Sequence, residues 1–330
     1  MKTRSPHSLF AALRLASALL LAGTVAACGG GSSDASTVVF TGTGSGSSLA
    51  AGYKQAKWAA GMTVSYPSDC KMKVVATGLP NHALPAYDLR PATGSYTTVV
   101  ATTPDGLALT LQPDPGTLNP ISLLIDICPS KAASTTVANM GTIGTMISGA
   151  ALFNAYDGTG NPAMQQNVSY TFTDAAGKTQ TAAFLDACNG HATPAPGNVY
   201  HYHGVSSCVT AQVDSVGGPS HLIGVALDGF PIYGGRDMAG QVITTAQLDA
   251  CNGITSATPE FPAGVYHYVL PEGVTGGKSS MGCYSGAVSA QTVAQAQATG
   301  ICTATAGSPR LVIALARPAA PARKTLPRAG

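Results

Sequence analysis

One hexapeptide occurs twice in this chain and constrains its fold more than any other feature. Residues 185–190 read LDACNG, and residues 248–253 repeat that segment without a change. A Tyr-His-Tyr segment follows each copy, at residues 200–202 and 266–268. Identity over a whole hexapeptide, followed by a second shared motif, is improbable by chance, so the sequence predicts an internal duplication.

The duplication predicts two repeat units, at about residues 145–208 and 220–286, inside one domain of residues 56–290. Charged residues make up only 10% of the chain, and Pro and Gly interrupt every candidate segment before residue 287. We therefore expect a mainly β fold, a duplicated pseudo-symmetric sandwich or barrel with disulfide-stapled loops. The sequence leaves the choice between sandwich and barrel open.

The start of the chain is typical of an exported bacterial lipoprotein. Three basic residues precede a short apolar run that ends in VAAC at residues 25–28. Because the run is too short to span a bilayer, residues 1–27 are predicted to be a signal peptide. The VAAC ending resembles a lipobox, which predicts lipidation of Cys28. In the alternative, an ordinary signal peptide is cut nearby and Cys28 is incidental.

Both ends of the chain are predicted to lie outside the domain. Residues 28–55 combine the lipidated cysteine with a Gly- and Ser-rich flexible linker. Gly29, rather than an aspartate, follows the cysteine, which by resemblance to lipoprotein sorting favours the outer membrane. Residues 291–330 are predicted to be a short helix, for which 287–298 is the candidate segment, and a disordered basic tail.

The charge distribution argues against nucleic acid as a partner. Residues 28–309 contain nine Lys or Arg and fifteen Asp or Glu, so this body carries a formal charge of about −6. A nucleic-acid-binding domain needs a basic face. The expected partner is the membrane, through the lipid anchor, and the sequence names no protein or glycan partner.

Seven cysteines remain after Cys28, and in an exported protein they are interpreted first as disulfides. The odd number leaves at least one of them free or paired elsewhere. Each repeat unit ends in a cysteine, which suggests the pairs Cys188–Cys208 and Cys251–Cys283, although other connectivities stay open. The seven are Cys70, Cys128, Cys188, Cys208, Cys251, Cys283 and Cys302.

Four ordered motifs resemble those of one known family. They are GLPNH at residues 78–82, LDACNGH at 185–191, YHYH at 200–203 and GVALDGFPIYGG at 224–235. Together they resemble the bacterial YHYH-domain family over roughly residues 60–286. The resemblance implies an exported context, and it implies no particular reaction.

The YHYH segment carries the clearest chemistry. If it forms a strand, successive side chains point to opposite faces, so His201 and His203 share one face and the two tyrosines share the other. Two such histidines have α-carbons about 7 Å apart, which lets both imidazoles reach one ion. His-X-His on a strand is therefore a candidate two-ligand platform for a transition metal.

Further ligands are available in the other motifs. His191 ends LDACNGH, His82 ends GLPNH, and His267 is the repeat partner of His201. Asp186 and Asp228 are candidates for an oxygen ligand or for an acceptor that fixes an imidazole tautomer. Five of the six histidines beyond the signal peptide lie in recognisable motifs, and such clustering is expected of a site.

A purely structural interpretation competes with the metal site. Histidines beside tyrosines can hydrogen-bond across a sheet, and Asn-Gly is good turn chemistry, so LDACNG itself is predicted to be structural. The repeat is asymmetric, because the second unit has Ile254 and Val269 where the first has His191 and His203. This difference favours the first unit as the place of chemistry, with His267 contributed across the repeat interface.

Two functions follow from the sequence. The first is an exported lipoprotein whose domain binds a transition metal, copper or zinc, and with an open coordination position such a site could activate water or oxygen. The second is a cell-surface structural or ligand-binding module without metal, for glycans or a partner protein. The sequence contains no Gly-X-Ser-X-Gly, His-Glu-X-X-His or phosphate-binding glycine loop, so it predicts no enzyme class.

Overall fold

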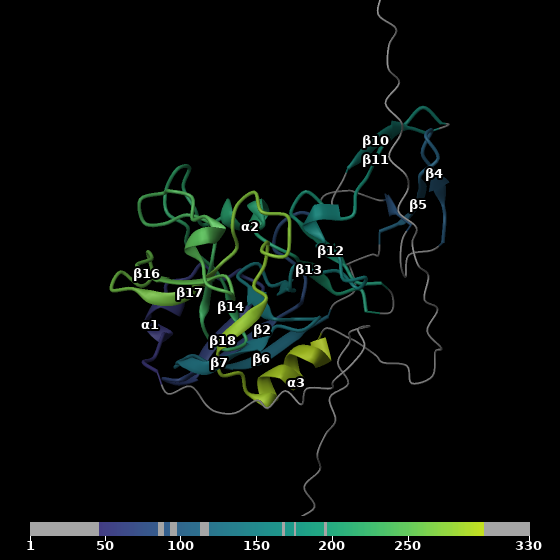
Figure 1. Cartoon of the computed structure of the whole chain (residues 1–330). Coiled ribbons are helices and arrows are strands. Elements are labelled where there is room, and N and C mark those ends of the chain that lie inside the picture. Colours follow the sequence, from purple (N-terminus) through teal and green to yellow (C-terminus); the bar gives the residue numbers. More distant parts are fainter. Residues whose placement is uncertain are drawn as a thin grey trace, which may run out of the picture.

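The computed structural model describes residues 46–84, 89–92, 98–112, 119–166, 169–174, 176–194 and 197–299. These residues form four β-sheets, three α-helices and two short 3-10 helices, η1 (Met164–Gln166) and η2 (Thr245–Gln247) (Figure 1). The predicted mainly β fold is therefore confirmed.

The largest sheet has eight strands and carries both LDACNG–Tyr-His-Tyr regions. In spatial order its strands are β12 (Gly190–Ala192), β13 (Tyr200–Tyr202), β9 (Ala151–Leu152), β8 (Gly144–Met146), β14 (Leu222–Ala226), β15 (Pro231–Tyr233), β17 (Val265–Val269) and β16 (Gly253–Ser256).

The two halves of this sheet use the same kinds of pairing. In one half the β8–β9 hairpin is followed by β13, parallel to β9, and by β12, antiparallel to β13. In the other half the β14–β15 hairpin is followed by β17, parallel to β15, and by β16, antiparallel to β17. The halves meet where β8 pairs with β14.

A three-stranded sheet packs into the same hydrophobic core. It consists of β1 (Thr63–Ser68), β2 (Lys71–Ala76) and β6 (Ile121–Asp126), in that order, and buried side chains alternate along β2 and β6. Helix α3 (Ala290–Thr299) packs on β6, where Thr292 donates to the Leu124 carbonyl at 3.0 Å and Gln295 accepts its N–H at 2.8 Å (Figure 1). The helix thus satisfies backbone groups of β6 that no strand pairs.

Two smaller sheets complete the chain. The five-stranded sheet lies to one side of the body in Figure 1 and has the order β10 (Tyr170–Thr173), β11 (Thr179–Ala182), β3 (Leu89–Pro91), β5 (Ala108–Leu111) and β4 (Ala101–Thr102). The fourth sheet pairs β18 (Cys283–Gly286) with β7 (Lys131–Val137).

Within the described residues, three disulfides hold the loops in place. Both pairs suggested by the repeat are present, Cys188–Cys208 and Cys251–Cys283, with Cα atoms 5.3 Å and 4.8 Å apart. The third joins Cys70 at the β1–β2 turn to Cys128 after β6, a pairing that the sequence did not single out. Several disulfides in one chain indicate an extracytoplasmic protein.

The ordered body begins earlier than the sequence analysis places it. Helix α1 (Ala50–Tyr53) lies within the segment 28–55 that was predicted to be a linker. Tyr53 is fully buried and donates to the Gly229 carbonyl at 2.8 Å, so an apolar anchor holds this end of the segment to the core. The helix predicted near 287–298 is present as α3.

Several predictions fall outside the described residues. They concern the signal peptide at 1–27, lipidation of Cys28, the pairing state of Cys302 and the basic tail beyond residue 299. Among the helices that the structure does describe, none has the length and apolar character needed to cross a bilayer.

Candidate metal centre

The first LDACNG copy is a turn held by the side chain of Asp186. One carboxylate oxygen of Asp186 accepts the backbone N–H groups of Cys188 at 2.8 Å and Gly190 at 3.0 Å. Asn189 adopts the left-handed region with φ 60°, which Asn tolerates well. A Cβ on Gly190 would lie 2.4 Å from the Tyr200 hydroxyl, and that hydroxyl donates to the second Asp186 oxygen at 2.6 Å.

The second copy repeats this turn. Asp249 accepts the N–H groups of Cys251 at 3.0 Å and Gly253 at 2.8 Å, and the Tyr266 hydroxyl donates to it at 2.9 Å. Asn252 has φ 67°. Because the motif residues serve the same turn in both places, the geometry supports a structural role for LDACNG, Asp186 included.

Strand β13 separates the YHYH side chains onto two faces, as strand geometry requires. The rings of Tyr200 and Tyr202 meet edge to face with centroids 5.4 Å apart. The imidazoles of His201 and His203 meet in the same way at 4.7 Å. The histidine face and the tyrosine face therefore have separate surroundings.

A third imidazole joins the histidine face from β12. His191 lies directly opposite His201 in the antiparallel β12–β13 pair. The Nε2 atom of His203 is 3.0 Å from Nε2 of His201 and 3.2 Å from Nε2 of His191. One ligand atom from each of the three lies within 4.8 Å of the others, so the histidine triad of His191, His201 and His203 could hold a metal ion.

Backbone carbonyls fix the orientation of two of these rings. His201 Nδ1 is 2.8 Å from the Val199 carbonyl and His203 Nδ1 is 2.7 Å from the Asn154 carbonyl. A carbonyl only accepts, so both Nδ1 atoms carry the proton and both Nε2 atoms carry a lone pair. Metal-binding histidines are typically held in this way.

The triad is enclosed by aromatic rings and one buried cation. The three imidazoles are 8%, 2% and 1% exposed. Phe153 stacks on His201 with centroids 3.8 Å apart, and Phe184 lies 5.0 Å from His191. The fully buried Arg90 places a guanidinium nitrogen 3.4 Å from His191 Nδ1. No sequence motif marks Arg90, which arrives from the five-stranded sheet.

Burial keeps the triad neutral. Desolvation lowers the pKa of His203 to about 4. It also lowers the pKa of His191 and His201 well below the ordinary histidine value, helped by the charge of the neighbouring imidazoles. Neutral imidazole is the form that binds metal, so near pH 7 no proton has to be displaced.

His267 is not part of the triad. Four strands, β9, β8, β14 and β15, lie between β13 and its own strand β17. Its Nδ1 donates to the Val265 carbonyl at 3.0 Å, as His201 does to Val199, but the opposite residue is Ile254 and the second neighbour on the strand is Val269. The prediction that His267 contributes a ligand to the first unit across the repeat interface is therefore wrong.

His82 lies on the tyrosine face instead. Its Nε2 is 2.6 Å from the Tyr202 hydroxyl, and its Nδ1 is 3.6 Å from Sγ of Cys188. His82, Cys188 and Cys208 form a second group of potential ligands, with one ligand atom of each within 4.8 Å of the others. The two sulfur atoms are joined in a disulfide, so this group differs in kind from the triad.

Asp228 is a buried structural carboxylate in the second half of the sheet. It accepts hydrogen bonds from the Tyr268 hydroxyl and, at 2.9 Å, from the Gly286 N–H. Burial raises its pKa to about 6. Its partners lie on the tyrosine face of β17, so Asp228, like Asp186, does not meet the triad.

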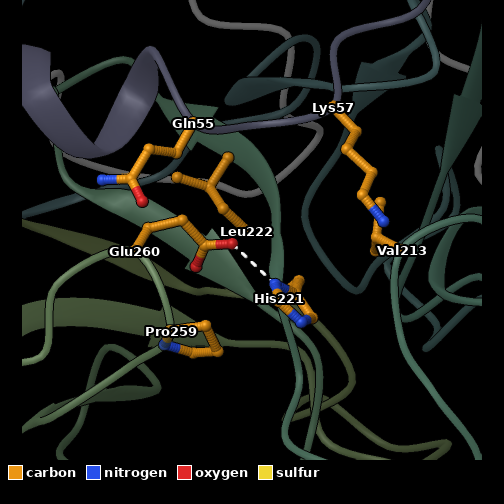
Figure 2. Close-up of a pocket in the computed structure, with 7 residues that line it drawn as sticks. All are labelled: Gln55, Lys57, Val213, His221, Leu222, Pro259 and Glu260. Atoms are coloured by element: carbon orange, nitrogen blue, oxygen red, sulfur yellow. Dashed lines mark hydrogen bonds and ion pairs between the residues drawn. The ribbon is translucent and has the colours of Figure 1, made fainter.

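A separate cavity of about 140 Å³ lies beside the second unit (Figure 2). On its wall, His221 Nδ1 is 2.8 Å from Glu260, and the other Glu260 oxygen accepts from the Tyr233 hydroxyl at 2.8 Å. No sequence motif marks either residue of this pair. The cavity is lined by Gln55, Lys57, Val213, His221, Leu222, Pro259 and Glu260.

Comparison with protein-family models matches residues 123–241 and 235–280 to the YHYH protein family. The matched span, residues 123–280, includes the triad, the eight-stranded sheet and the Cys188–Cys208 disulfide. No curated protein and no solved structure matches the chain.

Proposed function

With a YHYH-family domain at residues 123–280 as the premise, we propose that this chain is an exported lipoprotein whose domain holds a transition metal ion, copper or zinc. The protein ligands are His191, His201 and His203. Three neutral imidazoles suit either metal, and their burial protects the bound ion from competing ligands.

One contact carries the proposal. The Nε2 atoms of His201 and His203 are 3.0 Å apart, although the carbonyl partners of both Nδ1 atoms leave a lone pair on each Nε2. Two facing lone pairs repel in a buried site unless a cation lies between them. Their low pKa values argue against a shared proton in that place.

The spacing suits a tetrahedral ion. Nitrogens about 2.0–2.1 Å from a tetrahedral zinc are about 3.3 Å from one another. The observed Nε2–Nε2 separations of 3.0 and 3.2 Å need only a small expansion. A water molecule in the fourth position would have its pKa lowered by the ion, which is the chemistry that such a centre offers.

Metal analysis of the untagged mature protein tests this function. We expect about one copper or zinc ion per chain, and close to none in the His201→Ala/His203→Ala double variant. His267→Ala is the matched control, because it removes the buried histidine of the other unit and should leave the metal in place. Metal-free wild-type protein whose melting temperature ignores added copper and zinc would contradict the proposal.

We also propose that the two units arose by duplication. The equivalent residues share one register, since Gly190 pairs with Tyr202 in the first unit and Gly253 with Tyr268 in the second. The turn, the tyrosine–aspartate contact and the disulfide recur around both strand pairs. In this view the first unit keeps the metal site and the second keeps only the scaffold.

The lipid anchor at Cys28 remains part of the proposal. The disulfides support an extracytoplasmic location, and the VAAC segment supplies the modification site. Mass spectrometry of the membrane-extracted protein should find an acylated Cys28 at the N-terminus. A soluble mature protein that begins elsewhere would overturn the anchor.

A second candidate function, ligand binding without metal, is favoured by the cavity beside Glu260. Its wall combines a carboxylate, an imidazole and the nearby Lys57, which suits a small polar ligand. Thermal-shift screening of metal-free protein against sugars and peptides tests this role. A ligand that stabilises the wild type but not Glu260→Gln supports it, and a screen without any such ligand contradicts it.

A further inference from the structure

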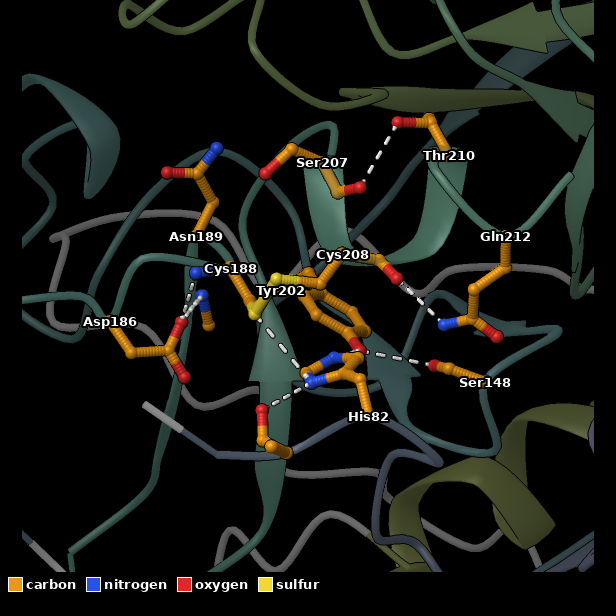
Figure 3. Close-up of a disulfide and its surroundings, with 12 residues drawn as sticks. His82, Ser148, Asp186, Cys188, Asn189, Tyr202, Ser207, Cys208, Thr210 and Gln212 are labelled. Carbon is orange, nitrogen blue, oxygen red and sulfur yellow. Dashed lines mark hydrogen bonds between the residues drawn. A yellow bond between two sulfur atoms is a disulfide. The ribbon is translucent and has the colours of Figure 1, made fainter. Parts of the chain in front are cut away.

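His82 belongs to the GLPNH motif, which precedes the first unit in the sequence, and the triad does not use it. Figure 3 shows its imidazole beside Tyr202 and the Cys188–Cys208 disulfide. Nδ1 is 3.6 Å from Sγ of Cys188 and 2.9 Å from the Ala83 carbonyl. Cys188 is fully buried, whereas Cys208 and His82 are partly exposed. An imidazole beside a partly accessible disulfide is the surrounding expected of a reactive pair rather than an inert staple.

We propose that this disulfide is a redox-gated metal site. After reduction, the thiolates of Cys188 and Cys208 and the imidazole of His82 bind a thiophilic d10 cation such as zinc. This site is separate from the histidine triad, lies on the opposite face of β13, and requires reduction before it can bind.

The distances fit this ligand set. In a tetrahedral zinc site with Zn–S about 2.3 Å and Zn–N about 2.0–2.1 Å, a sulfur and a nitrogen ligand are about 3.6 Å apart. The separation between His82 Nδ1 and Cys188 Sγ is 3.6 Å. The two sulfurs must move to about 3.8 Å from each other after cleavage, which side-chain rotation can supply.

Reduction follows ordinary thiol–disulfide exchange with a dithiol. A thiolate of the dithiol attacks the accessible Sγ of Cys208, the bond between the two protein sulfurs breaks, and Cys188 leaves with the electron pair. The second thiol of the dithiol then displaces Cys208, so the dithiol is oxidised to a disulfide and the protein pair is reduced. Binding of the cation releases the remaining thiol protons.

Tyr202 supplies the support that a ligating imidazole needs. In the disulfide form Nδ1 of His82 donates to the Ala83 carbonyl at 2.9 Å. To bind the ion, Nδ1 gives up that hydrogen bond and the proton moves to Nε2, which is 2.6 Å from the Tyr202 hydroxyl. That hydroxyl is in turn 3.1 Å from the Ser148 hydroxyl, so the chain of hydrogen bonds can reverse. A ligating histidine typically donates its second N–H to such a partner.

The other two disulfides provide internal controls. Cys251–Cys283 holds the matching loop of the second unit, and Cys70–Cys128 staples the three-stranded sheet. Within the described part of the chain, neither pair gathers a histidine or carboxylate ligand within 4.8 Å. Reduction of either should expose thiols without building a three-ligand site.

Cadmium titration before and after treatment with dithiothreitol tests the proposal on the mature protein. We expect reduction to add one bound cadmium per chain, with thiolate-to-cadmium charge-transfer absorption in the ultraviolet. The Cys188→Ser/Cys208→Ser variant should lose this band, and Cys251→Ser/Cys283→Ser should keep it. His82→Ala should weaken the added site by at least about tenfold.

The sulfur band separates this site from the triad, because imidazoles alone do not produce it. It should therefore survive in His201→Ala/His203→Ala protein even if the proposed function fails. A reduced wild-type protein without the band overturns the proposal. So does binding that is unchanged by His82→Ala, including the case in which reduction unfolds the domain and exposes thiols at random.

Discussion

The two halves of the eight-stranded sheet have one scaffold and two kinds of interior. In both, a turn built on aspartate, asparagine and glycine orders a Tyr-His-Tyr strand. In the first, three imidazoles converge on that strand. In the second, Ile254 and Val269 take two of the three places, and His267 is left with a tyrosine ring 4.9 Å away.

This difference separates what the fold needs from what the chemistry needs. The second unit is well ordered by its tyrosine contacts and disulfide although it lacks two histidines. Histidine at those positions is therefore not required to build the strand pair. Three buried imidazoles in the first unit are costly to desolvate, and the metal ion that we propose would offset that cost.

The largest effect should come from copying the triad into the second unit. Ile254→His combined with Val269→His places two new imidazoles around His267 at positions equivalent to those of the first unit. We expect a second metal ion to bind, with an affinity at least about a thousandfold above the wild-type second unit, because multidentate sites add several kcal/mol. Elemental analysis and calorimetric titration measure this gain.

The matched control is the same pair of substitutions with His267→Ala, which removes the third ligand. It should bind only the metal of the first unit. A transplanted triad that folds, as shown by circular dichroism, but binds no second ion would mean that three histidines are not sufficient and that Arg90 is essential to the first site.

Acid should next distinguish the two units in metal-free protein. His203 has a folded pKa of about 4 against about 6.5 unfolded. The unfolded chain therefore binds the proton first, and stability is lost as the pH falls from about 6.5 to about 4. The loss from His203 alone is about 3 kcal/mol, and His203→Gln should remove this part of the slope. Denaturant unfolding at pH 7 and pH 4.5 measures it.

Asp228 in the second unit changes the stability with pH in the opposite direction to His203. Its folded pKa of about 6 is higher than in the unfolded chain, so the stability that it contributes is present at low pH and lost as the pH rises through 6. Asp228→Asn should therefore remove a slope of opposite direction. Equal slopes in wild type and His203→Gln would contradict the buried, neutral triad.

Period-two alternation predicted the histidine face from the sequence, and the repeat suggested two of the disulfide pairs. His201 and His203 share a face because strand geometry leaves no other arrangement, and a short closed loop brings His191 to the opposite strand. Local rules of this kind act over a few residues, so one sequence is enough to apply them.

Long-range placement could not be obtained in the same way. The pairing of strands places four strands between β13 and the strand of His267, and it lets His82 reach the tyrosine face from a distant loop. Arg90 and the Cys70–Cys128 bond likewise depend on contacts between segments far apart in the chain. No periodicity or motif in the sequence encodes those contacts.

Substitution of the glycine in the repeated turn should lower the free energy of unfolding by a smaller amount, similar in both units. A Cβ at Gly190 would lie 2.4 Å from the Tyr200 hydroxyl, and at Gly253 it would lie within 1.8 Å of the Tyr266 hydroxyl. Each Gly→Ala substitution should cost about 2–3 kcal/mol by overpacking. Gly158→Ala, whose Cβ would meet nothing within 4 Å, is the neutral control. Unchanged unfolding midpoints would contradict this view of the turn.

Removal of the tyrosine hydroxyl that contacts the turn aspartate should have the smallest effect on stability, and the effect should differ between the two units. The Tyr200 hydroxyl donates to Asp186, which is 8% exposed, so Tyr200→Phe leaves a buried carboxylate oxygen unsatisfied and should cost about 1.5–2 kcal/mol. Tyr266→Phe should cost about 1 kcal/mol or less, because the side chain of Asp249 is 36% exposed and water can replace the hydroxyl. Both variants should keep the full metal content, since the tyrosines face away from the triad. If Tyr200→Phe instead released the metal, the two faces of β13 would be coupled, and the scaffold and the site would no longer be separable.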